Sequence, residues 1–265
     1  MKLTVKTAAA LVAVAVVSVS CVSTKTAGPN TLSEEEKADG WRLLWDGRTG
    51  EGWVGEKEKF QRFPQKGWEM KDGVLTVFPC VRRNSQGRNE RIPPAENKGG
   101  GGSIVTVRKY RDFAFKCDFR LTHAANSGIK YFYDETINNG TTLEYQILDL
   151  ANPDAKNGVD GNRSIASLYD MMPAKADHLL KPLGEWNTAM IVSKGSHVEH
   201  WLNGVKVLEY ERGGAAFMEA FRKSKYTGKD FDTNGKWGLT PEGRIQLQDH
   251  GDATVSYRSI KIKEL

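Results

Sequence analysis

Short segments in which apolar and polar residues alternate are the feature that most constrains this chain. In residues 113–121, the odd positions are Phe, Phe, Cys, Phe and Leu, while the even positions carry Ala, Lys, Asp and Arg. Successive side chains of a β-strand point to opposite faces, so this pattern predicts a strand with one buried face. Similar segments recur along the chain, with turns between them and little helical periodicity. The sequence therefore predicts an all-β sandwich or barrel.

Turn residues between these segments predict antiparallel hairpins. The Asp72-Gly73 pair supplies the two positive-φ positions of a tight turn. A three-stranded meander is predicted over 186–210, where Lys-Gly-Ser and Asn-Gly mark the turns. No internal repeat or further boundary follows residue 40, so we expect a single domain over 41–265. The other expected elements are strands at 68–70, 74–78, 143–148, 244–248 and 255–262, and short helices at 33–38 and 215–223.

The amino terminus has the pattern of a bacterial secretory leader. Lys2 and Lys6 precede an apolar run over 8–17 that is too short to cross a bilayer as a permanent helix. Small residues directly before Cys21 resemble a lipobox, in which the cysteine becomes lipidated. We therefore expect a signal peptide at 1–20, a lipidated Cys21 with a polar tether at 21–40, and a lipid-anchored location in the cell envelope, in the periplasm or at the outer membrane. The alternative is an ordinary signal peptide in which Cys21 has no role.

Composition and motifs exclude several classes of function. The formal net charge is +5, and the basic residues are scattered or gathered in the polar loop 81–98, so nucleic-acid binding is not expected. The chain has no nucleophile elbow, phosphate-binding loop, dinucleotide fingerprint or His-Glu-x-x-His zinc motif. The sequence requires no cofactor, although scattered Asp and Asn residues leave a divalent metal open. Cys80 and Cys117 can either pair or remain free thiols, and nothing indicates the oligomeric state.

Alternation also places polar side chains from three strands on a common face. Glu144 and Gln146 share one face of their strand, and Gln246 and Gln248 share one face of theirs. Carboxylate, amide and amine groups bind sugar hydroxyls, and aromatic rings cover the C–H faces of a sugar, so this surface suits a carbohydrate. The alternative is an outer sheet face that is polar only because water covers it. The third strand adds Lys130 to the polar face, on the side opposite to Ile129, Tyr131 and Tyr133.

Of the five histidines, His250 is the candidate for acid–base chemistry. Imidazole titrates near neutral pH and is the usual general base in enzymes. His250 closely follows the strand that carries Gln248, and loops at strand ends are where catalytic groups gather. His200 shares the register of Val198 and Leu202, so we expect it to have a structural role.

Eight short motifs occur in a fixed order along the chain. Together they resemble the bacterial 3-keto-disaccharide hydrolase domain family, over essentially the whole chain from about Trp41 to Leu265. The resemblance implies a concanavalin A-like jelly-roll β-sandwich of two antiparallel sheets that acts on glycosides oxidised at C3. The motifs are Trp45–Gly47, Gly67–Glu69 with Asp72–Leu75, Asn126–Ile129, Glu144–Asp149, Ser167–Asp170, Gly184–Asn187, His200–Gly204 and Leu247–Gly251.

The implied chemistry starts from the ketone at C3, which makes the C2 proton acidic because its removal gives an enolate. Loss of that proton lets the C1 substituent leave by β-elimination, and addition of water completes a net hydrolysis. The resemblance and the strand faces together suggest His250 as the base, with Glu144 or Asp149 as the acid or as the group that orients the imidazole. The predicted substrate-binding residues are Asn126, Lys130, Gln146, Tyr169, Gln248 and Trp201.

Three other functions fit parts of the sequence. A non-catalytic, lectin-like module would bind sugar mainly through Trp53, Trp201 and Tyr169. A conventional glycosidase would need two carboxylates at a defined separation, for which Glu144 and Asp149 are the candidates. A structural lipoprotein of the envelope would explain the leader but not the polar sheet face.

Overall fold

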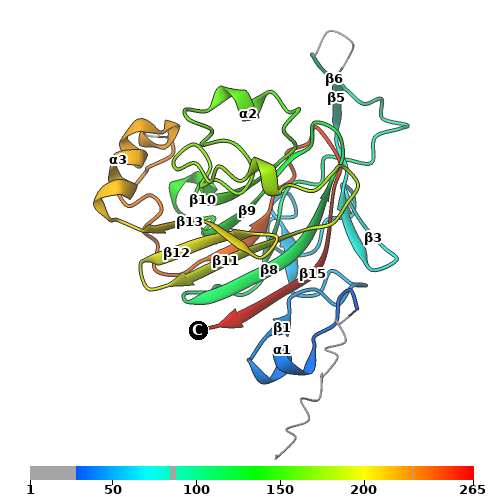
Figure 1. Cartoon of the computed structure of the whole chain (residues 1–265). Coiled ribbons are helices and arrows are strands. Elements are labelled where there is room, and N and C mark those ends of the chain that lie inside the picture. Colours follow the sequence, from blue (N-terminus) through cyan, green and yellow to red (C-terminus); the bar gives the residue numbers. More distant parts are fainter. Residues whose placement is uncertain (1–27, 84–87, 229) are drawn as a thin grey trace, which may run out of the picture.

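Two antiparallel sheets lie face to face in the computed structural model, which describes residues 28–83, 88–228 and 230–265 (Figure 1). The larger sheet contains, in spatial order, β13 (Val205–Glu211), β12 (His197–Leu202), β11 (Asn187–Lys194), β8 (Phe113–Leu121), β15 (Val255–Glu264), β4 (Val74–Val77) and β3 (Trp68–Lys71), and β1 (Arg42–Leu43) pairs with β15. The smaller sheet contains β10 (Leu143–Leu148), β9 (Asn126–Tyr133), β14 (Arg244–Leu247), β7 (Ile104–Thr106) and β2 (Trp53–Gly55). This arrangement confirms the predicted jelly-roll type of β-sandwich.

The remaining elements are short. A separate hairpin is formed by β5 (Val81–Arg83) and β6 (Asn89–Arg91). The α-helices are α1 (Glu34–Ala38), α2 (Asp154–Asn157) and α3 (Ala215–Lys223). Three single-turn 3₁₀ helices are η1 (Asn138–Gly140), η2 (Asp177–Leu179) and η3 (Lys225–Thr227). The expected helices at 33–38 and 215–223 are therefore confirmed, with Ser33 as the N-cap of α1.

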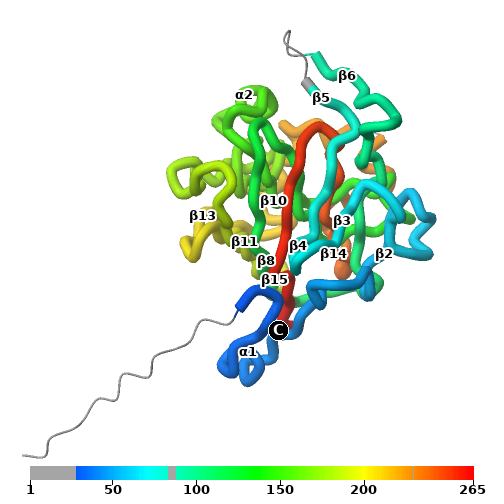
Figure 2. Tube along the Cα trace, turned by 90° about the vertical axis from the view of Figure 1, so that its right-hand side faces the viewer, coloured from blue at the N-terminus to red at the C-terminus, as the bar shows by residue number. Residues whose placement is uncertain are grey.

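The core lies between the inner faces of the two sheets. Alternate residues of β8, including Phe115 and Phe119, are fully buried against Tyr145 and Ile147 of β10 and other residues of the same cluster. The carboxy-terminal strand β15 runs between β8 and β4, so the last strand of the chain is an interior strand of the larger sheet (Figure 2). The period-two pattern of 113–121 is confirmed, because hydrophobic burial drives one face of that strand inward.

The predicted turn chemistry is also present. Asp72 and Gly73 have φ angles of 51° and 72°, which is the pair of left-handed positions that a two-residue hairpin requires. One expectation about side-chain facing was wrong. Phe132 has a φ angle of 58°, which interrupts the alternation of β9. As a result Tyr133 leaves the main core and packs with Val54 and Val105 on the outer side of the smaller sheet.

The proposed leader, the lipidated Cys21 and most of the tether fall at residues 1–27, outside the described residues. No helix in the described part of the chain is both long and apolar enough to span a bilayer. Cys80 and Cys117 are free thiols, which settles the alternative that the sequence left open. Cys117 is buried in the core, where burial raises the pKa of its thiol well above the ordinary value.

Candidate active site

A cavity of about 200 Å³ opens on the polar face of the smaller sheet. Strands β9 and β10 and the residues that follow β14 line one part of it. The loop that carries Tyr169, the residues after η1, and η3 with the residues that follow it line the rest. Polar and aromatic side chains predominate, which is the composition expected of a sugar site. The lining residues are Asn126, Lys130, Thr141, Thr142, Glu144, Gln146, Tyr169, Lys225, Tyr226, Phe231, Gln248 and His250.

Strand register brings the sheet residues of the cavity together. Glu144 of β10 is paired with Lys130 of β9, and Gln146 is paired with Gly128. The backbone N–H of Gln248 donates to the carbonyl of Gly128 over 3.0 Å, which joins the end of β14 to the same row. Paired residues in neighbouring strands point to the same side of a sheet. These side chains therefore project together into the cavity.

Gly128 leaves the space that Glu144 occupies. A Cβ atom at Gly128 would lie 2.1 Å from Oε1 of Glu144 and 2.7 Å from its Cδ. No ordinary contact between heavy atoms is that short. Only glycine at this position allows the carboxyl group to lie flat against β9.

Glu144 is buried, with 5% of its surface exposed. Burial raises the pKa of Glu144, and the positive charges of Lys130, Lys225 and His250 oppose that rise without cancelling it. A carboxyl group with a raised pKa keeps its proton more readily near neutral pH. Glu144 is therefore suited to donate a proton to a leaving oxygen.

Two amide oxygens in the cavity wall have no hydrogen-bond partner among the residues that the structure describes. Gln146 donates from Nε2 to Oδ1 of Asn126 over 3.3 Å. Its own Oε1 and the Oε1 of Gln248 are buried and accept no hydrogen bond from the described residues. Buried acceptors left without a donor are costly. Hydroxyl groups of a bound sugar would satisfy both.

His250 lines the cavity from the loop that follows β14. Its Nδ1 is 3.2 Å from Oδ1 of Asp252, whose side chain is 5% exposed. Burial lowers the pKa of His250, but the ion pair with Asp252 and the negative charges of Glu144 and Asp154 outweigh it and leave the pKa raised. The loop is fixed at Gly251, whose carbonyl accepts hydrogen bonds from the backbone of the β5 segment over 2.9 and 3.0 Å.

Aromatic residues and a second lysine form the rim. The Tyr169 hydroxyl donates to Oδ2 of Asp154 over 2.8 Å, and the Nζ of Lys225 lies 4.4 Å from the centre of the Tyr169 ring. Tyr226 stacks on Trp237 with ring centres 4.1 Å apart. Sequence reasoning missed five lining residues: Thr141, Thr142, Lys225, Tyr226 and Phe231. The only signal for this wall is the run of aromatic residues in an otherwise polar stretch, Phe221 to Trp237.

The structure brings seven of the nine proposed catalytic and substrate-binding residues to the cavity and leaves two outside it. Asp149 does not line the cavity. Its carboxylate accepts a hydrogen bond from the backbone N–H of Ala124 over 2.5 Å and so holds the turn between β8 and β9. Trp201 lies on the outer face of the larger sheet, where its Nε1 donates to Glu199 over 2.8 Å. The seven that line the cavity are Asn126, Lys130, Glu144, Gln146, Tyr169, Gln248 and His250.

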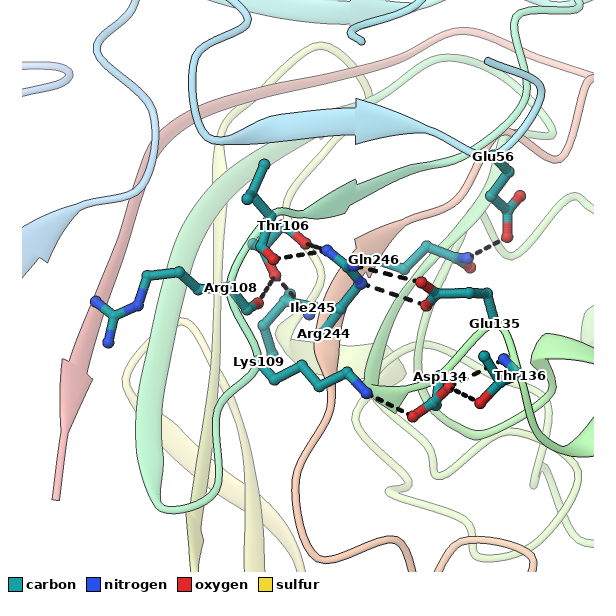
Figure 3. A network of polar contacts seen from close by, with 11 residues as sticks. Glu56, Thr106, Arg108, Lys109, Asp134, Glu135, Thr136, Arg244, Ile245 and Gln246 are labelled. Atoms are coloured by element: carbon teal, nitrogen blue, oxygen red, sulfur yellow. Dashed lines mark hydrogen bonds and ion pairs between the residues drawn. The ribbon is translucent and has the colours of Figure 1, made fainter. Parts of the chain in front are cut away.

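Beyond the cavity, the polar residues of the smaller sheet are engaged with one another (Figure 3). Gln246 donates from Nε2 to Glu56 over 2.7 Å and does not line the cavity. Arg244 donates to the carbonyls of Thr106 and Val107 and forms an ion pair with Glu135 at 3.3 Å. Arg244 does not line the cavity either.

One group of side chains has the composition of a metal site, but it lies on the larger sheet. The candidate ligand atoms of His197, Glu199 and Glu209 lie within 4.8 Å of one another. The Nζ of Lys206 lies 3.2 Å from Oε1 of Glu199 and 2.5 Å from Oε2 of Glu209. The lysine therefore pairs with both carboxylates, and we regard the group as a surface ion-pair network.

Comparison with known proteins identifies the family. A model of the 3-keto-alpha-glucoside-1,2-lyase-like domain matches residues 40–263, which is most of the chain. The chain belongs to this family. It is also 34% identical over 261 residues to a 3-keto-disaccharide hydrolase of Bacteroides thetaiotaomicron, a match that covers 92% of this chain and 84% of that protein. The chain is accordingly an enzyme of this family.

Two solved structures of Parabacteroides distasonis proteins, both classed with the glycosyl hydrolases, share the fold. One is 28% identical with a TM-score of 0.70, over 90% of this chain and 100% of the other. The second is 25% identical with a TM-score of 0.58, over 85% of this chain and 99% of the other. The family fold thus extends over the sandwich that carries the cavity.

Proposed function

We propose that this enzyme hydrolyses 3-keto-disaccharides and related 3-keto-glycosides by elimination followed by hydration. The observation that carries the proposal is the pairing of two titratable groups in one cavity. The pKa of His250 is raised by Asp252, Glu144 and Asp154, and burial raises the pKa of the Glu144 carboxyl group. A base and an acid held in different environments at one site are the arrangement that elimination requires.

In the first step His250 removes the proton at C2 through Nε2, because its Nδ1 faces Asp252. The C–H electrons move to the C3 carbonyl and form an enolate. When the enolate collapses, a C1–C2 double bond forms, the C3 carbonyl is restored and the C1–O bond breaks. Glu144 gives its proton to the departing oxygen.

In the second step water adds across the C1–C2 double bond. The water oxygen bonds to C1, its proton passes to the Glu144 carboxylate, and the protonated His250 returns a proton to C2. No oxidant or reductant is consumed. The polar residues Asn126, Gln146 and Gln248 are suited to bind the sugar hydroxyls, and Lys130 the negative charge that develops on the ring.

A conventional two-carboxylate glycosidase is the weaker alternative. Among the described residues that line the cavity, Glu144 is the only carboxylate. Direct hydrolysis of an unoxidised glycoside needs a second carboxylate across the bond. A lectin-like module would bind sugar but release no product, and it would give no reason for pairing Glu144 with His250.

The decisive experiment incubates purified enzyme with a 3-keto-disaccharide and with the same disaccharide unoxidised. We expect release of a 3-keto-monosaccharide from the first only, with an unsaturated intermediate detectable by mass spectrometry. His250→Ala should lower the rate by about 10²–10⁴-fold, the usual contribution of a general base. His123→Ala is the matched control, since His123 is exposed and does not line the cavity. Wild-type activity in His250→Ala would exclude this mechanism.

For the location we propose a lipid anchor on Cys21 after removal of residues 1–20. The apolar run 8–17 and the small residues before Cys21 support this proposal. Labelling of the expressing cells with a radioactive fatty acid should mark the wild-type protein, and the protein should fractionate with membranes. Cys21→Ser should abolish both. A labelled Cys21→Ser protein would contradict the proposal.

A further inference from the structure

Lys225 contributes a second ammonium group to the cavity that sequence patterns did not predict. Its Nζ lies 4.4 Å from the centre of the Tyr169 ring and 5.3 Å from that of Tyr226. No carboxylate oxygen of the described residues lies within ion-pair distance of it. The rings hold the ammonium group by cation–π attraction and leave its N–H donors available to a ligand.

The position of Lys225 is fixed by the backbone around it. Its N–H donates to Oδ2 of Asp170 over 2.8 Å, and Oδ1 of Asp170 accepts from Arg163 over 2.6 Å. The hydroxyl of Ser224 accepts a hydrogen bond from the backbone N–H of Tyr226 over 3.2 Å, and Ser224 is the N-cap of η3. These bonds fix the backbone at Lys225 and Tyr226, and the two tyrosine rings place the ammonium group before substrate arrives, as effective electrostatic catalysis requires.

A neighbouring lysine provides the contrast. Lys223 lies on α3, two residues earlier, with 75% of its side chain exposed, and pairs with Glu219 at 2.7 Å. That is the usual state of a surface lysine. Burial lowers the pKa of Lys225, while the carboxylates of Glu144, Asp170 and Asp154 act in the opposite direction. Lys225 thus sits in a partly desolvated site within the electrostatic influence of the proposed acid.

We infer that Lys225 is a catalytic residue that binds the C3 oxygen of the keto sugar and stabilises the enolate formed when the C2 proton leaves. The inference rests on the proposed function. A ketone oxygen carries only partial negative charge, whereas the enolate oxygen carries a full charge. A preorganised ammonium group therefore binds the transition state more tightly than the substrate, and its effect falls on kcat. Lys130 is the cross-strand neighbour of Glu144, and its positive charge lowers the pKa of that carboxyl group.

The test separates proton abstraction from cleavage. The probe is a 3-keto-1,5-anhydroglucitol that carries deuterium at C2 and has no leaving group at C1. The base can exchange its C2 deuterium for a solvent proton through the enolate, but elimination cannot follow. Exchange is measured by NMR, and kcat and KM are measured in parallel with a 3-keto-disaccharide.

Lys225→Met should slow deuterium exchange and lower kcat by about 10²–10³-fold, the loss seen when one donor to an oxyanion is removed. Lys225→Arg, which keeps the charge, should recover part of both rates even if Lys225→Met folds poorly. Lys223→Met is the matched control and should behave as wild type. If Lys225→Met exchanges deuterium at the wild-type rate, or changes KM alone, the role at the enolate is wrong while the proposed function stands. If the wild-type enzyme neither exchanges nor cleaves, both proposals fall.

Discussion

The imidazole of His250 and the carboxylate of Asp252 lie 3.2 Å apart on the loop after β14, with Asp252 almost wholly buried and His250 reaching the cavity. A buried carboxylate on one ring nitrogen leaves the other nitrogen free to act and favours the protonated ring. The carboxylate that orients the His250 ring thus comes from Asp252, two positions further along the same short loop.

Asp252→Asn should move the acidic limb of the pH–rate profile to lower pH. The neutral imidazole is the active base, so activity falls as pH drops through the pKa of His250. That pKa is raised above 6.5 in the wild type, because Asp252, with smaller contributions from Glu144 and Asp154, outweighs the effect of burial. Removing the negative charge lowers it again, and the plateau rate should fall as well because the ring loses its orientation. The measurement is kcat/KM against pH.

Asp149→Asn is the control for that profile. Asp149 also lies near a histidine, with 3.8 Å to Nδ1 of the exposed His123, but it does not line the cavity. Its profile should match that of the wild type. An acidic limb that stays in place in Asp252→Asn would show that His250 is not the group being titrated.

Glu144→Gln should slow substrates with poor leaving groups far more than substrates with good ones. The amide keeps the shape of the side chain but has no proton to give, so cleavage of a 3-keto-disaccharide should fall by about 10²–10⁴-fold. A 3-keto-glucoside of nitrophenol needs no acid and should retain most of its rate. Equal losses on the two substrates would mean that Glu144 binds the sugar rather than protonating the leaving oxygen.

Gly128→Ala should damage activity more than stability. The new methyl group would lie 2.1 Å from Oε1 of Glu144, so the carboxyl group must move aside. A displacement of about 1 Å in an active site can cost about 10²-fold in rate, whereas overpacking costs about 1–3 kcal/mol. Steady-state kinetics and urea unfolding together check this expectation. Loss of folding with normal activity in the remaining folded fraction would contradict it.

The sequence predicted the sheet residues of the site because strand alternation is a local rule. Glu144 and Gln146 belong to β10, and Gln248 directly follows β14; the apolar residues of both strands must face the core, so the facing of the polar residues follows from burial. The same rule explains why the prediction for Trp201 failed. Since His200 on the same strand lies in the core, its neighbour must point outward.

Other parts of the site depend on tertiary structure. Lys225 reaches the cavity through a single 3₁₀ turn after α3, and no spacing rule links that turn to β10. Tyr133 faces the opposite side from the one predicted because Phe132 has a left-handed backbone conformation. Bulky residues rarely adopt that conformation, and no turn residue in the sequence indicates it. Asp149 follows β10 directly, yet it is used to hold a turn.

His200 connects the core to the loop that carries Tyr169. It is fully buried, with Nδ1 2.8 Å from the carbonyl of Ala166 and Nε2 2.8 Å from the Tyr131 hydroxyl. The carbonyl can only accept, so Nδ1 carries the proton and Nε2 accepts from Tyr131, which in turn accepts from Tyr210 over 2.5 Å. Every group is satisfied when the ring is neutral.

Acid should therefore destabilise the protein through His200. Burial lowers its pKa to about 4 in the folded state, against an ordinary value of 6.5. Between these values the unfolded chain binds a proton that the folded chain does not, so stability is complete above pH 6.5 and falls as pH drops towards 4. The loss attributable to this group is on the order of 3 kcal/mol. Urea unfolding at several pH values should show it in the wild type, and His200→Gln, although less stable at neutral pH, should have a flatter dependence. Parallel curves for the two proteins would mean that other groups cause the acid sensitivity.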